Sequence, residues 1–184
     1  YPLSYGRIKW RRPPQASLAS RQGAGQPRRP SGRLCKPFDM HLTKYGLWIG
    51  RSIAQDDRPA AARLAEQLGY GALWVGGSPR LPTLRTRLEA SEGIVIASGI
   101  VNIWAYDPAE LAEEFAAIEA DFPGRLLLGI GIGHPEATQE YEKPLTKTQR
   151  FLDGIEASPH PVPRERMALA ALGPRMLDLS YERT

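Results

Sequence analysis

Apolar and polar positions alternate in blocks along residues 45–184, and the blocks take two forms. Short apolar runs that end in glycine or another small residue predict strands at 45–50, 71–77, 93–101, 125–131 and 167–173. Longer segments with apolar residues three or four positions apart predict helices at 59–68, 81–90, from Asp107 onward, around 151–155 and at 174–183. The chain is therefore expected to repeat a strand–helix unit five times.

The predicted strands are continuous apolar runs, which is typical of strands that are buried on both faces. Such strands form parallel sheets covered by helices. One helix start is well marked, because Asp107 provides a cap, Pro108 takes the first helical position and Glu110 places a negative charge in the first turn. Leu111, Phe115 and Ile118 then form its apolar stripe. The expected fold class is α/β, either a doubly wound sheet or part of a (β/α)₈ barrel.

The segment GRLLLGIGIGHPE, residues 124–136, combines a strand with three glycines. Their spacing does not fit the dinucleotide fingerprint G-x-G-x-x-G, and the chain has no G-x-x-x-x-G-K-[ST] phosphate loop. Two explanations stay open: the glycines let a flat ligand lie against the backbone, or they allow close packing of helix and strand. Gly76, Gly77 and Gly99 also end apolar strands. This asymmetry predicts a ligand pocket at the carboxyl ends of the strands.

The basic character of the chain is confined to residues 1–39. This segment holds nine basic residues against Asp39 alone, a net charge of +8, whereas residues 40–184 hold 15 basic and 19 acidic residues, a net charge of −4. It lacks apolar periodicity, so we expect a disordered arm. Three explanations compete: translated upstream sequence ahead of Met40, which we favour, a transit-like segment, or a nucleic-acid tail. Nucleic-acid binding is not the favoured function, because no binding fold follows the arm.

Few residues suit metal binding or covalent crosslinks. Cys35 is the single cysteine, which excludes an internal disulfide and a cysteine-built metal site. The histidines, at positions 41, 134 and 160, are scattered, and we expect no metal. No apolar run reaches membrane-spanning length, and no signal peptide is visible. We expect a cytoplasmic protein without a membrane partner.

Five segments in order, YGLWIG, GYGALWVGGSP, IVIASGIVNIWAYDPAELA, GRLLLGIGIGHPE and LAALGPRML, resemble the luciferase-like flavin oxidoreductases. The resemblance runs from Tyr45 to Thr184 and is strongest to the branch that uses the deazaflavin coenzyme F420. It implies a (β/α)₈ TIM barrel that binds F420, or FMN as the alternative, at the carboxyl ends of its strands. The implied activity is hydride transfer between F420 and a small organic substrate, or flavin-dependent monooxygenation.

The resemblance also implies which residues contact the cofactor. Ser98, Gly99 and Ile100 match a bulge after the third strand, where a cis peptide often lies behind the ring. The other implied contacts are Gly76 after the second strand, Asn102 and Trp104 beside the ring, Gly131 and Gly133 after the fourth strand, and Gly173 toward the phosphate tail. For Trp104, filling the core is an equally weighted alternative.

The acid–base role departs from the family pattern. Several relatives place a catalytic histidine after the second strand, where this chain has Gly76-Gly77-Ser78. His134 is the candidate catalytic residue instead, because imidazole titrates near neutral pH. A loop histidine that caps backbone groups is the alternative.

Residues 40–184 hold five strand–helix units, whereas a complete barrel takes roughly 250 residues. We therefore expect the N-terminal part of a luciferase-like barrel, truncated before strands six to eight. The alternative function is an inactive barrel fragment that acts as an association or binding module through its exposed sheet edges. The expected partners are a small-molecule substrate and, as a candidate, a second copy of the chain.

Overall fold

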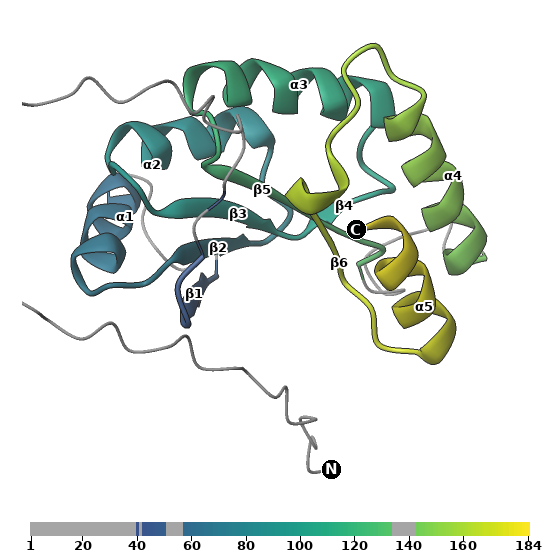
Figure 1. Ribbon diagram of the computed structural model, residues 1–184, viewed down its shortest axis with the longest axis horizontal. Coiled ribbons are helices and arrows are strands. Elements are labelled where there is room, and N and C mark those ends of the chain that lie inside the picture. The colour runs from purple at the N-terminus through teal and green to yellow at the C-terminus, as the bar shows by residue number, and fades with distance from the viewer. Residues whose placement is uncertain (1–39, 41, 51–56, 134–142) are drawn as a thin grey trace, which may run out of the picture. The chain divides into compact units, whose positions relative to one another are not determined.

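The computed structural model describes residues 40, 42–50, 57–133 and 143–184. The predicted arm, residues 1–39, lies outside the described residues. The elements in chain order are β1 (Gly46–Ile49), α1 (Arg58–Gln67), β2 (Ala72–Gly76), the 3₁₀ turn η2 (Leu81–Leu84), α2 (Arg85–Glu89), β3 (Val95–Gly99), β4 (Val101–Asn102), α3 (Pro108–Asp121), β5 (Leu126–Gly131), α4 (Pro144–Glu156), the 3₁₀ turn η4 (Arg164–Arg166), β6 (Met167–Leu169) and α5 (Pro174–Arg183). Figure 1 shows them in place.

The strands form a parallel sheet whose order follows the chain. β1 pairs with β2, β2 with β3, β3 with β5, and β5 with β6, while β4 continues the path of β3 and also pairs with β5. A doubly wound sheet reverses its strand order at a switch point. No reversal occurs among the described strands, so the progression is that of a partial (β/α)₈ barrel.

The main core lies between the sheet and the helices that pack on its outer side (Figure 1). Alternate residues of each strand face this layer, because side chains point to opposite faces along a strand. The strand residues that share this core are Leu73, Val75, Ile96, Val101, Leu126, Leu128, Ile130 and Met167. The predicted stripe of α3, Leu111, Phe115 and Ile118, is buried against them, which confirms that prediction.

Two predicted helix boundaries are confirmed by their caps. The Asp107 side chain accepts hydrogen bonds from the backbone N–H groups of Ala109 and Glu110, at 2.9 and 3.1 Å. Gly69 follows the last turn of α1 with a φ of 81°, a conformation that glycine adopts without a steric penalty. The start of α3 and the end of α1 are therefore each determined by a capping residue that can be recognised in the sequence.

Three predicted elements differ from the structure. The predicted helix at 81–90 begins as the 3₁₀ turn η2 before α2. The predicted strand at 93–101 is divided into β3 and β4, because the ladder between β3 and β5 breaks after Ala97. The predicted strand at 167–173 ends at Leu169, since Gly173 already caps α5.

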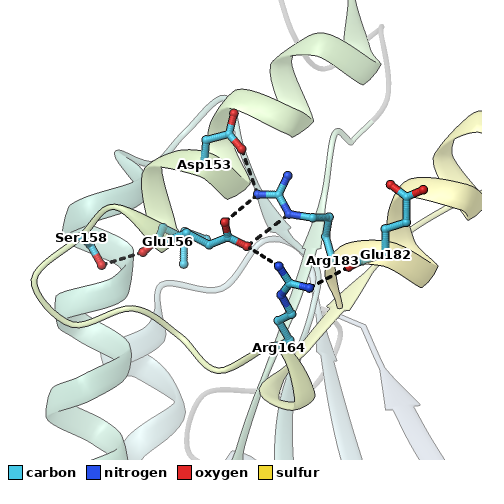
Figure 2. Close-up of polar contacts among 7 residues, drawn as sticks. Asp153, Glu156, Ser158, Arg164, Glu182 and Arg183 are labelled. Carbon is cyan, nitrogen blue, oxygen red and sulfur yellow. Dashed lines mark hydrogen bonds and ion pairs between the residues drawn. The ribbon is translucent and has the colours of Figure 1, made fainter.

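Buried and surface ion pairs attach the last elements to the rest of the sheet. Arg166, which is fully buried, donates to the Leu126 carbonyl and to the Glu119 carboxylate, the latter at 2.7 Å. Figure 2 shows the second attachment, in which Arg183 of α5 pairs with Asp153 and Glu156 of α4. α5 is thereby joined to α4 through the side chain of its last residue.

Candidate functional site

The inner face of the sheet, opposite the helices, changes character along the strands. At the amino end, Ala72, Val95, Ala97 and Leu127 form a small buried cluster, against which Met40 and Trp74 pack. Toward the carboxyl end the same face presents glycines, at positions 76, 99, 129 and 131. The carboxyl half of this face is therefore a floor of backbone, and the ligand pocket predicted there from the sequence stays a prediction.

Ser98 and Gly129 join β3 to β5 where the regular ladder is interrupted. The buried Ser98 hydroxyl accepts a hydrogen bond from the Gly129 N–H and donates one to the Gly129 carbonyl, both at 2.9 Å. A Cβ on Gly129 would lie 1.9 Å from the Ser98 carbonyl oxygen. The hydroxyl that was a candidate cofactor contact thus has its donor and acceptor used within the chain, and Ser98 acts as a positioning residue.

The next peptide bond, Gly99–Ile100, is cis, at the position that the resemblance implied. After it, Val101 pairs with Ile130 and Asn102 with Gly131. Ile100 lies over Gly131, since its Cγ1 is 3.0 Å from the position of a Cβ there. The structure therefore brings Gly99, Ile100, Asn102 and Gly131 together at one edge of the inner face.

Asn102 is held by two hydrogen bonds, one through its backbone and one through its side chain. Its N–H donates to the Ser78 hydroxyl at 3.0 Å, and its Oδ1 accepts from the Trp104 N–H at 3.1 Å. Gly133, with a φ of 64°, approaches so closely that a Cβ would lie 3.0 Å from Asn102 Nδ2. Because Oδ1 is engaged by the chain, Nδ2 is the part of this amide that the described residues leave without an acceptor.

Trp104 lies on the helix side and not on the inner face. Its indole N–H donates to the Ile132 carbonyl at 2.9 Å, and Lys147 Nζ lies 5.3 Å from the ring centroid. The ring packs against the main core. Of the two roles weighed from the sequence, this placement supports core filling.

Two other tryptophans, Trp48 and Trp74, lie over the glycine floor, and the sequence analysis missed both. They are register partners in β1 and β2. Trp48 is 61% exposed, donates its indole N–H to the Gly99 carbonyl at 3.3 Å, and covers Gly76 and Gly99. The repeated segments LWIG (47–50) and LWVG (73–76) carry the signal that could have identified them.

The remaining candidates lie elsewhere or are not described. Gly173 caps the amino end of α5, and a Cβ there would meet open space. His134 lies outside the described residues. Trp48, Ile100, Asn102 and the glycine floor have no ionisable group, so the described part of this surface is neutral. It suits a flat, uncharged ring, and any acid or base must come from another residue.

No helix among the described residues is long and apolar enough to cross a membrane.

Comparison with solved structures supports the fold. The chain superposes on an F420-dependent secondary alcohol dehydrogenase in complex with an F420–acetone adduct (TM-score 0.64, 17% identity, 78% of this chain and 56% of that one). It also superposes on the coenzyme F420 dependent tetrahydromethanopterin reductase from Methanopyrus kandleri (TM-score 0.59, 15% identity, 74% and 52%). A third is the oxygenating constituent of 3,6-diketocamphane monooxygenase from the CAM plasmid of Pseudomonas putida, in complex with FMN (TM-score 0.52, 16% identity, 61% and 38%).

The chain spans about half the length of the first two of these structures. Independently, the family model of the luciferase-like monooxygenases matches residues 40–153, which include β1 to β5 and most of α4. This match covers more than half of the chain and agrees with the strand order and the solved structures. The chain therefore belongs to the luciferase-like monooxygenase family.

Proposed function

We propose that this chain forms part of the cofactor site of an F420-dependent oxidoreductase that transfers a hydride between F420 and a small organic substrate. The observation that carries the proposal is the neutral inner face at the carboxyl ends of β2, β3 and β5, with its glycine floor and exposed Trp48. Family membership supports it, as do the F420-dependent enzymes among the similar structures. FMN, and with it monooxygenation, is the alternative that the diketocamphane monooxygenase supports.

The residues present fit a flat ring system. Cβ atoms added at Gly99 and Gly131 would come within 3.0–3.1 Å of the side chains of Trp48, Ile100 and Ala170, so the missing side chains let these apolar groups lie directly on the backbone floor. Trp48 covers part of this floor, and its exposure allows it to move aside or to stack on a ligand. A bound deazaflavin would supply the hydride chemistry.

Each residue then has a defined task. Ile100, which lies on the backbone at Gly131, supports the ring, and Asn102 Nδ2 offers it a hydrogen bond. His134 is proposed as the acid–base residue, and Gly173 as a phosphate contact at the amino end of α5, where the helix dipole favours an anion. The substrate is proposed to be a small molecule, and a second copy of the chain is the proposed partner.

The test is a fluorescence titration of F420, then FMN, into the full chain. Saturable F420 binding is expected, and Gly131→Ala should weaken it by about tenfold or more, because the added methyl group would displace Ile100, the proposed ring support, whose Cγ1 lies 3.0 Å from the new Cβ. Gly93→Ala is the matched control: it lies at the opposite end of β3, and its Cβ would meet only the Glu66 carboxylate at 3.6 Å.

Circular dichroism must show that both variants are folded. If the folded wild-type chain binds neither cofactor, the proposal is wrong, and association through the sheet edges becomes the better explanation. Size-exclusion chromatography with light scattering would then measure that association, and it tests the proposed homodimer in either case.

A further inference from the structure

Three arginines surround a hollow of about 260 Å³ where β1 and β2 end. Arg58 begins α1, Arg80 precedes η2, and Arg87 lies in α2. The hollow is also lined by Thr83 and by Val75, whose side chain faces the helix layer. It therefore lies on the helix side of β2, whereas Trp74 lies on its inner face.

Arg87 is unusual because it is buried without a counter-charge. Only 3% of it is exposed, and no ion pair with it is found among the described residues. One guanidinium nitrogen donates to the Thr83 carbonyl at 3.2 Å, while Nε finds no hydrogen-bond partner in the part of the chain that the structure describes. A buried charge is costly unless it is paired and hydrogen-bonded. An arginine in this state suits a site that an anion completes.

The neighbouring groups add to the positive field in the hollow. Burial lowers the pKa of Arg87, and the charge of Arg58 lowers it further. Arg58 begins a helix that has no acidic residue in its first turn, and the Asp57 side chain makes no capping hydrogen bond. Like charges held together in this way repel each other unless a negative ligand lies between them.

Arg80 is held differently from the other two arginines. Its guanidinium lies 4.4 Å from the centroid of the Tyr106 ring, and its charge lowers the pKa of Glu114 against the stronger raising effect of burial. Part of its charge is therefore balanced outside the hollow. Among the described residues, no ion pair balances Arg58 or Arg87, so their charge is left for a ligand.

We propose that this arginine pocket binds the phosphate group of a small molecule other than the flavin or deazaflavin cofactor. Guanidinium groups present forked N–H donors that match the oxygens of phosphate. The volume is below the roughly 300–1,000 Å³ typical of pockets for drug-sized ligands, so the pocket takes a phosphate group and not a whole ring system. The proposal does not depend on the cofactor site, because the two surfaces lie on opposite sides of β2.

The experiment is a titration of inorganic phosphate into the full chain at constant ionic strength, followed by calorimetry and by the melting temperature. The wild-type chain should bind phosphate saturably and melt at a higher temperature when it is bound. Arg58→Gln and Arg87→Met should each weaken binding by about tenfold or more, as expected for the loss of a charged hydrogen-bond partner. Arg63→Gln, the same charge change on the exposed side of α1, is the control and should bind like the wild type.

Folding can be separated from binding in this design. Arg87→Met removes an unpaired buried charge, so without phosphate it should be at least as stable as the wild type. A phosphate response that is absent, or equal in the wild type and both pocket variants, would overturn the proposal. Equal responses would assign the binding to other basic residues, such as those of 1–39. FMN and riboflavin should both leave phosphate bound, and displacement by FMN alone would assign the anion site to the cofactor.

Discussion

Replacing Gly129 with alanine is the sharpest test of how the sheet is joined at the site. The new Cβ would lie 1.9 Å from the Ser98 carbonyl oxygen, and contacts under 3.0 Å are essentially never seen for real Cβ atoms. The two backbones would have to separate by about 1 Å. Because the obstacle is backbone in a buried sheet, no side-chain rotation relieves it.

The cost follows from what that separation breaks. Both hydrogen bonds between the Ser98 hydroxyl and Gly129 would lengthen, leaving a buried N–H and a buried carbonyl poorly satisfied at about 1–3 kcal/mol each. Overpacking adds about 1–3 kcal/mol. The expected loss is therefore about 3 kcal/mol or more, a large part of the 5–15 kcal/mol that typically stabilises a domain.

Urea denaturation followed by circular dichroism measures this loss as a fall in the midpoint. Gly173→Ala is the control, since its Cβ would meet nothing within 4 Å and its φ of −89° suits alanine. Ser98→Ala should give an intermediate loss, because it removes the hydroxyl without the clash. If Gly129→Ala lies within about 1 kcal/mol of the wild type, β3 and β5 are not joined as described.

Three further predictions concern charged groups. Glu119→Gln should cost about 3–5 kcal/mol of unfolding free energy, because it leaves Arg166 buried without its partner; a loss below 1 kcal/mol in urea denaturation would contradict this. Arg183→Gln should cost less than about 1 kcal/mol, since its partners Asp153 and Glu156 are 63% and 40% exposed, and the small loss should shrink further in high salt. Burial alone would raise the pKa of Glu66, but hydrogen bonds from the backbone N–H groups of residues 92–94 and the charge of Arg125 lower the pKa below its ordinary value of 4.5. The stabilising contribution of Glu66 is therefore complete above pH 4.5 and lost as the pH falls through its lower folded-state pKa. Glu66→Gln should flatten the acid limb of a curve of unfolding free energy against pH. An unchanged acid limb would show that Glu66 is not the source of this pH dependence.

The arrangement of elements could be predicted because it depends on local signals. Apolar runs, the Asp107 cap and the glycine after α1 are visible in the sequence, and each acts within a few residues of its own position. The break between β3 and β4 has no such signal in the hydrophobic pattern. It depends on Ser98 bonding to Gly129, which lies 31 residues away, and only the family resemblance indicated its place.

The candidate sites were harder to predict from the sequence, because they depend on contacts between segments that are far apart in the chain. Arg85 and Arg87 are two positions apart in one short helix and look equivalent in the sequence. Arg85 pairs with Asp121 at the surface, whereas Arg87 is buried at the hollow and pairs with no carboxylate of the described residues. The two arginines differ in burial because of where η2 and α2 lie relative to the ends of β1 and β2. No local sequence pattern predicts that placement.

At the end of β2, two neighbouring residues, Trp74 and Val75, face two different surfaces of the sheet. Val75 faces the helix layer and the arginine hollow, while Trp74 faces the inner side and packs on the small apolar cluster. Gly76 borders both, since its backbone lines the hollow and its absent side chain leaves room for Trp48. Because neighbouring residues of a strand point to opposite faces, a slip of one residue in the pairing of β2 would exchange the two surfaces. The register of Trp48 with Trp74 and of Gly76 with Gly99 therefore keeps a neutral ring surface and a cationic pocket apart within one strand end.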